Sequence, residues 1–115
     1  MCHVLIIEDD AIAAIDIRDT LRSAGATSFS FAATEREAME AARSARPAVV
    51  TADVMLSAGS GTEAVRAIEA ELGPLPVIFI TATPHQCEGE SAHPVIEKPF
   101  RTDELANLFR TVWKA

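Results

Sequence analysis

Apolar residues follow two alternating patterns along this chain. Short continuous runs, typical of strands buried on both faces of a sheet, lie at residues 4–7, 28–32, 48–52, 77–80 and 95–97. Between them lie longer stretches in which apolar residues recur every three or four positions, which is typical of helices packed on one side. The alternation predicts an α/β fold in which helices connect the strands of a doubly wound parallel sheet.

The helical stretches carry signals for their ends. Gly25 and Gly73 are expected to end the first and third helices. Thr34 and Glu37 form a predicted capping box at the start of the second, in which each side chain accepts a hydrogen bond from the other residue's backbone N–H. The positions expected to face the sheet are Ala14, Ile17, Leu21 and Ala24, then Ala38, Ala41, Ala42 and Ala45, then Ala64, Ile68 and Leu72, and finally Leu105, Leu108, Phe109 and Val112.

One interval breaks the alternation. Residues 82–94 have almost no apolar periodicity, contain Gly89 and carry a proline near each end. We expect an irregular, mobile loop with at most one helical turn near residues 84–86. The fourth helix, between the last two strands, is therefore expected to be short or disordered.

Four of the apolar runs end on a polar group that can bind a metal or a phosphoryl group. These groups are Glu8 and Asp9 after the first run, Asp53 after the third, Thr81 after the fourth and Lys98 after the fifth. The carboxyl ends of parallel strands share one edge of the sheet, and ligands bind there. We therefore expect these side chains to converge.

This set of side chains suits phosphoryl transfer. Asp53 is the candidate nucleophile, because a carboxylate can accept a phosphoryl group covalently. A hard cation held by Glu8, Asp9 and Asp53 would offset the charge of the transferring group, and Mg²⁺ typically binds through one or two carboxylates plus water and phosphate. Lys98 would hold a phosphate oxygen, and Thr81 would donate a hydrogen bond to it.

Each of these residues has an ordinary interpretation when taken alone. Residues 8–10 also suit a helix N-terminus, where acidic groups complement the helix dipole. Asp53 alone would be a turn residue, Thr81 a strand residue, and Lys98-Pro99 a surface turn. Only their joint placement at one edge of one sheet favours the phosphoryl site.

Three other kinds of site fit the sequence less well. A haloacid-dehalogenase-like phosphatase needs a second Asp two residues after the nucleophile, where this chain has Met55. A nucleotide-binding module of the same fold needs a glycine-rich loop after the first strand, where this chain has acids. A zinc site from His85, Cys87 and His93 is conceivable, but the spacing matches no common zinc motif.

Composition narrows the function classes. The chain has 115 residues and a formal net charge of −7, which predicts one domain and argues against direct binding to nucleic acid. Its two cysteines cannot form a disulfide framework and fit a reducing compartment. No apolar run is long enough to span a membrane, and no signal peptide precedes the first strand. We therefore expect a cytoplasmic protein.

The chain resembles, over its whole length, the receiver domain of bacterial two-component response regulators. The matching motifs are the acid pair in Ile7-Glu8-Asp9-Asp10, Asp53 in Thr51-Ala52-Asp53-Val54-Met55, Gly61, Thr81-Ala82 and Lys98-Pro99-Phe100. The resemblance implies a flavodoxin-like fold, with a five-stranded parallel sheet in the order 2-1-3-4-5 and helices on both faces. Because the predicted strands and helices run from the start of the chain to its end, we expect residues 1–115 to form one receiver domain without an output domain.

The resemblance implies a specific chemistry as well. Asp53 would be phosphorylated by a histidine kinase or a histidine phosphotransfer protein, and Thr81 and Lys98 would contact the phosphoryl group. Mg²⁺ would be held by Asp9, Asp53 and the backbone carbonyl of Met55, with Glu8 acting through water. The Lys98–Pro99 peptide bond would be cis. Such a protein catalyses its own phosphorylation and dephosphorylation and is not an enzyme that turns over external substrates.

The chain departs from the family pattern at its readout positions. Ser57 stands where receivers commonly have Pro, and Val95 stands where most carry the aromatic residue that forms a switch with Thr81. We therefore expect phosphorylation to draw in Thr81 and order residues 82–94, which would alter the binding of an unknown output protein. The alternatives are a phosphate sink or shuttle in a phosphorelay, and a binding module that acts without phosphorylation.

Two further expectations concern the surroundings of the site. If Ala14, Ile17 and Leu21 face the sheet, Ile12 and Ile15 point outward beside Asp16, and we interpret them as a docking patch for the helical bundle of a phosphodonor. Crowding of the acids predicts that, without metal, at least one of them has a raised pKa.

Overall fold

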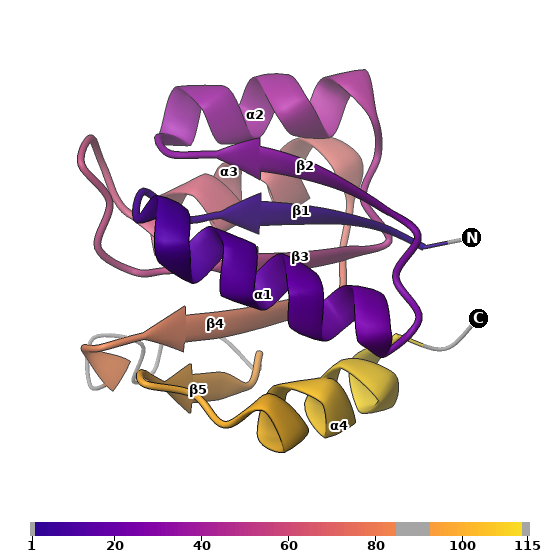
Figure 1. The fold of residues 1–115 in the computed structure, drawn as a ribbon. Coiled ribbons are helices and arrows are strands. Elements are labelled where there is room, and N and C mark those ends of the chain that lie inside the picture. The colour runs from indigo at the N-terminus through magenta and orange to yellow at the C-terminus, as the bar shows by residue number, and fades with distance from the viewer. Residues whose placement is uncertain (1, 85–92, 114–115) are drawn as a thin grey trace.

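A five-stranded parallel sheet forms the centre of the molecule, in the order β2-β1-β3-β4-β5 (Figure 1). The computed structural model describes residues 2–84 and 93–113. The strands are β1 (His3–Ile7), β2 (Ser28–Ala32), β3 (Val49–Ala52), β4 (Val77–Thr81) and β5 (Val95–Glu97). Both the predicted fold class and the predicted strand order are confirmed.

Helices cover both faces of this sheet. They are α1 (Ala11–Ser23), α2 (Glu35–Ser44), α3 (Gly61–Leu72) and α4 (Thr102–Val112). The helices α1 and α4 lie together on one face, and α2 and α3 lie on the other (Figure 1). The helical turn expected near residues 84–86, and most of the loop predicted at 82–94, lie outside the described residues.

The sheet separates two apolar layers. Along β1, Leu5 and Ile7 pack toward α2 and α3, whereas Val4 and Ile6 pack toward α1 and α4. All four side chains are fully buried. Burial on both faces explains why the inner strands appear in the sequence as continuous apolar runs and not as alternating ones.

Two details of α2 differ from the sequence prediction. The Thr34 hydroxyl accepts a hydrogen bond from Glu37 N at 3.1 Å, as expected, but the Glu37 carboxylate accepts from Ala33 N at 2.8 Å instead of Thr34 N. Ala38 and Ala42 are buried against the sheet, but Ala45 is exposed because the helix ends at Ser44. The periodic stripe therefore extends one residue beyond the helix.

Among the described residues, no helix is both long and apolar enough to cross a membrane.

Candidate functional site

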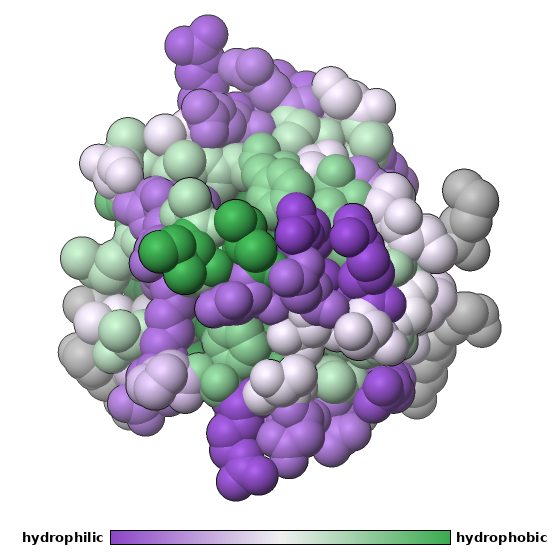
Figure 2. All heavy atoms as spheres, viewed as in Figure 1, coloured by the Kyte–Doolittle hydropathy of each residue, from purple (hydrophilic) through white to green (hydrophobic). Residues whose placement is uncertain are grey.

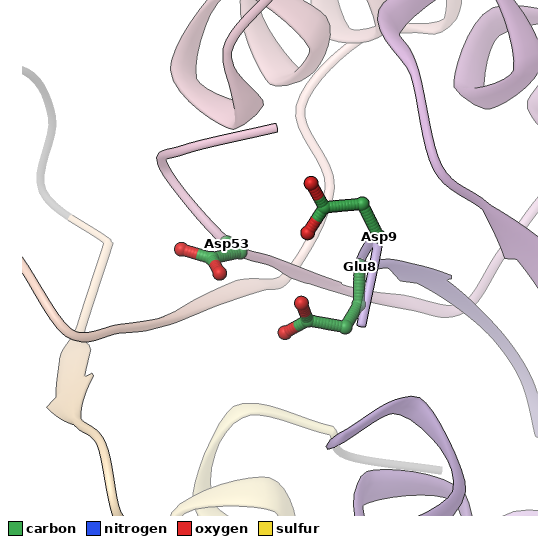
Figure 3. A group of neighbouring side chains, drawn as sticks. All are labelled: Glu8, Asp9 and Asp53. Atoms are coloured by element: carbon green, nitrogen blue, oxygen red, sulfur yellow. The ribbon is translucent and has the colours of Figure 1, made fainter. Parts of the chain in front are cut away.

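The side chains that follow the strands converge at the carboxyl edge of the sheet. Glu8, Asp9 and Asp53 each offer one carboxylate oxygen to a group whose atoms all lie within 4.8 Å of one another (Figure 3). Figure 3 shows Glu8 and Asp9 at the end of β1 and Asp53 at the end of the adjacent strand β3. Residues that are far apart in the sequence therefore form one acidic cluster.

Lys98 places its ammonium group between two of these acids. Its Nζ lies 2.6 Å from Glu8 Oε1 and 2.9 Å from Asp53 Oδ2. The side chain of Glu8 is only 1% exposed and that of Asp53 10%, whereas Lys98 is 21% exposed. The lysine reaches both carboxylates from β5, and the adjoining Lys98–Pro99 bond is cis, as expected.

Burial and charge act on the pKa values of this pair in different ways. Burial raises the pKa of Glu8, and its hydrogen bonds to Lys98 and Asp10 N only partly reverse this. Burial by itself lowers the pKa of Lys98, but hydrogen bonds and attraction to Glu8 and Asp53 outweigh it, so the pKa is raised. One acid has a raised pKa, as predicted, but desolvation is its main cause and repulsion by Asp53 is a minor one.

The backbone around Asp53 is tightly held. Asp53 N donates to Ile7 O at 3.0 Å, and Met55 N donates to Asp53 Oδ1 at 3.3 Å. A Cβ at Gly61 would lie 1.8 Å from the carbonyl oxygen of Asp53, so only glycine fits where the start of α3 passes the end of β3. The predicted metal contact of the Met55 carbonyl stays a prediction.

Asp9 and Asp10 have different surroundings. Asp9 is exposed, and its Oδ2 accepts a hydrogen bond from the Ser57 hydroxyl at 2.8 Å. Asp10 caps α1, because its Oδ1 accepts from Ile12 N at 3.0 Å and from Ala13 N at 3.5 Å. The Ser57–Asp9 contact was missed by sequence reasoning, in which Ser57 was only a departure from the family pattern.

Thr81 is the last residue of β4, and Val95 is the first residue of the neighbouring parallel strand β5, where it pairs with Phe79. Thr81 is fully buried, and its Oγ1 lies 3.1 Å from Thr83 Oγ1 and accepts from Thr83 N at 3.1 Å. Val95 at the start of β5 is 38% exposed. The roles of these two residues in phosphoryl binding and switching stay predictions.

An exposed apolar patch on α1 lies beside the cavity into which Lys98 opens. Ile12 is 73% exposed and Ile15 45%, which confirms that both point away from the sheet. Ile12 and Asp16 help to line an open cavity of about 640 Å³, together with Lys98 and Phe100. Figure 2 shows strongly hydrophobic atoms over the first half of α1 next to strongly hydrophilic ones.

Of the three residues considered for a zinc site, His93 is the one among the described residues. His85 and Cys87 lie outside the described residues. His93 packs against Phe79, with a distance of 6.3 Å between the two ring centroids. Its Nε2 lies 3.1 Å from Glu69 Oε1. Glu69 belongs to α3, so this contact ties the segment before β5 to that helix.

The donor set of the acidic cluster fits a hard cation. It consists of carboxylate oxygens alone, and Asp9 is open to water while Glu8 and Asp53 are buried. Mg²⁺ prefers this combination of a few carboxylates and retained water.

Comparisons with known proteins agree on the kind of domain. Residues 4–110 match the family model for the response regulator receiver domain. The phyllosphere-induced regulator PhyR of Methylorubrum extorquens is 38% identical over 104 residues, which cover 86% of this chain and 39% of that protein. This chain therefore spans well under half the length of that relative.

Solved structures show the same similarity. The solution structure of the Erythrobacter litoralis PhyR response regulator REC domain has a TM-score of 0.87 and 34% identity, covering 96% of this chain and 88% of that one. A crystal structure of a PhyR mutant from Bartonella quintana, described as an anti-anti-sigma factor, has a TM-score of 0.81 and 32% identity. It covers 94% of this chain and 46% of that one.

Proposed function

The chain belongs to the response regulator receiver family, and we propose that it accepts a phosphoryl group on Asp53 from a histidine kinase or a histidine phosphotransfer protein and signals through protein contacts. The single observation that carries this proposal is the position of Lys98 Nζ, 2.9 Å from Asp53 Oδ2 and 2.6 Å from Glu8 Oε1. A cation held beside a nucleophilic carboxylate is what phosphoryl transfer requires.

The transfer step is a displacement at phosphorus. An oxygen of the Asp53 carboxylate attacks the phosphorus of a phosphohistidine and forms a P–O bond, while the P–N bond breaks. The imidazole nitrogen leaves with the electron pair and takes up a proton from water. Lys98 offsets the charge of the phosphoryl oxygens, and Thr81 turns its hydroxyl from Thr83 toward one of them.

Mg²⁺ is the proposed cofactor of this step. The residues that would hold it are Asp9, Asp53 and the Met55 carbonyl, with Glu8 acting through water. When bound, Mg²⁺ supplies positive charge that offsets the negative charge of the phosphoryl oxygens. Since the phosphoryl group ends on the chain itself, the protein is proposed to catalyse its own modification and not to turn over an external substrate.

The proposed output is a change in binding to another protein. The net charge of −7 disfavours nucleic acid as a direct target. The Bartonella quintana relative is described as an anti-anti-sigma factor, a role played by binding a protein, and we extend that kind of partner to this chain.

A phosphate sink or shuttle is the second candidate. The observation that favours it is Val95, which is small and 38% exposed at the position of the family's switch aromatic. A sink needs the transfer chemistry but no readout surface. Amide exchange separates the two functions, because a signalling receiver is expected to change its protection at a partner-binding surface upon phosphorylation, whereas a sink needs no change beyond the site itself.

The first test is phosphorylation of the chain by the small donor phosphoramidate, with and without Mg²⁺, followed by intact mass. Asp53→Asn is the matched control, since it keeps the shape of the side chain and removes the nucleophile. We expect a phosphoryl adduct that depends on Mg²⁺ and is absent from the variant. An equal adduct on Asp53→Asn, or none on the unmodified chain, would contradict the proposal.

A further inference from the structure

The loop between β3 and α3 reaches back to the acidic cluster through one serine. Ser57 Oγ donates a hydrogen bond to Asp9 Oδ2 at 2.8 Å. The two residues lie on different strand-end loops, one after β3 and one after β1. The contact therefore joins the carboxylate of a proposed metal ligand to a segment that follows the phosphorylated residue.

This loop is held in shape by contacts outside the site. Met55 pairs with Ser60 across the loop, and Ala58 pairs with Thr34 at the start of α2. Ser60 N also donates to Glu35 Oε2 at 2.8 Å. These contacts give Ser57 a fixed place from which to reach Asp9.

Gly59 allows the closest of these approaches. Its φ of +87° lies in the region that favours glycine, and a Cβ there would lie 1.9 Å from Glu35 Oε2. The loop therefore sits directly on the Glu35 carboxylate of α2, with no side chain between them. Displacement of Glu35 would release the Ser60 contact and, with it, the position of Ser57.

A carboxylate that binds a metal needs an outer contact to fix its orientation. Asp9 is exposed, so without such a contact its carboxylate would be free to rotate away from Glu8 and Asp53. Each carboxylate oxygen has two lone pairs, so the bond from Ser57 leaves Oδ1 and one lone pair of Oδ2 able to bind a cation. Outer hydrogen bonds of this kind support metal affinity.

We propose that Ser57 is a positioning residue for Mg²⁺, which holds the Asp9 carboxylate toward Glu8 and Asp53 through its hydroxyl. The inference rests on the proposed function, because it assumes that Asp9 is a metal ligand.

The test compares Ser57→Ala with Ser57→Thr, which retains a hydroxyl at the same position. The affinity for Mg²⁺ is measured by titration with MgCl₂, followed by backbone amide chemical shifts of the full chain. We expect Ser57→Ala to weaken Mg²⁺ binding by about 10-fold, whereas Ser57→Thr is expected to retain the affinity of the original chain. The effect lies at the lower end of the range for residues that hydrogen-bond a metal ligand, because this hydrogen bond is exposed.

A second readout separates positioning from a general loss of structure. The free energy of unfolding of Ser57→Ala in EDTA is expected to match that of the unmodified chain, because Ser57 is an exposed residue. A fall in stability that accounts for the whole loss of affinity would overturn the positioning role.

The outcomes also separate this inference from the proposed function. If the unmodified chain binds Mg²⁺ and Ser57→Ala binds it equally well or more tightly, the inference is wrong and the proposed function stands. Tighter binding would mean that the hydroxyl competes with the cation for Asp9. If the unmodified chain does not bind Mg²⁺, the metal assignment fails and the inference fails with it.

Discussion

At the scale of single residues, Lys98 offsets part of the negative charge of the site. It forms ion pairs with Glu8 and Asp53, two carboxylates that are much less exposed than the lysine itself. A buried carboxylate that loses its partner keeps the cost of its desolvation. Removing Lys98 therefore has an effect that depends on whether Glu8 is charged.

We predict that Lys98→Met lowers the free energy of unfolding of the metal-free chain by about 1–3 kcal/mol at pH 7. The loss is expected to be smaller at pH 5. Because burial raises the pKa of Glu8 above its ordinary value of 4.5, the folded chain holds more protons than the unfolded chain just above that pH. The free energy of unfolding therefore falls as the pH rises from about 4.5 through the pKa of Glu8 in the folded chain. Loss of Lys98 raises that pKa further, because Lys98 lowers it, and so extends this pH range upward.

Urea titrations at the two pH values in EDTA measure this difference. Arg36→Met is a suitable control, because its partner Glu40 and the arginine are both exposed, at 60% and 89%. We expect little change from that variant at either pH. An equal loss of stability at pH 5 and pH 7 for Lys98→Met would contradict the assigned cause.

The convergence of these residues was predictable, but their pairing was not. Strand ends share an edge in any parallel sheet, so Glu8, Asp53 and Lys98 had to meet. Which carboxylate is buried depends on how the surrounding loops pack. The hydrogen bond from Ser57 to Asp9 could not be predicted either, because it depends on loop contacts that leave no periodic signal in the sequence.

At the scale of elements, the adjacent acids Asp9 and Asp10 at the start of α1 have different roles. Asp10 caps the helix through Ile12 N and Ala13 N, and it is not part of the acidic cluster formed by Glu8, Asp9 and Asp53. A cap and a metal ligand respond differently to loss of charge. A cap needs only a side-chain oxygen, which Asn supplies as well as Asp.

We predict that Asp10→Ala lowers the free energy of unfolding by about 1 kcal/mol and that Asp10→Asn does not. Mg²⁺ affinity is expected to change by less than about twofold in Asp10→Asn, since the cluster keeps its three carboxylates. Thermal unfolding and a Mg²⁺ titration measure the two quantities. A loss of Mg²⁺ binding in Asp10→Asn would place Asp10 among the ligands instead.

The elements themselves were predicted well where burial is two-sided. The inner strands β1, β3 and β4 appear as continuous apolar runs because each faces two layers. Helix ends were predicted less well. Ala45 continues the spacing of α2 beyond its last residue, because periodicity reports which face is apolar and not where the helix stops.

At the scale of the whole molecule, the exposed face of α1 adjoins Lys98, the residue that pairs with Glu8 and Asp53 in the candidate site. Ile12 and Asp16 line the cavity that opens beside Lys98 and Phe100. A partner that docks on α1 would therefore reach the site directly. An apolar patch next to acidic groups suits a helical partner that carries an apolar stripe bordered by basic residues.

We predict that the double variant Ile12→Ala and Ile15→Ala slows phosphotransfer from a phosphorylated histidine phosphotransfer protein by about 10-fold at a subsaturating donor concentration. Phosphorylation by phosphoramidate is expected to be unchanged. Phe31→Ala is the matched control, because Phe31 on β2 is 49% exposed and does not line the cavity. Equal slowing with both donors would rule out a docking role for the patch.

The contact between Gly61 and the Asp53 carbonyl has a mechanical consequence. Since a Cβ at Gly61 would lie 1.8 Å from that oxygen, the last residue before the loop and the first turn of α3 touch backbone to backbone. No side chain is available there to change rotamer and absorb strain. A shift of the main chain at Asp53 would therefore reach the start of α3 without passing through a side chain, and we expect α3 to follow such a shift.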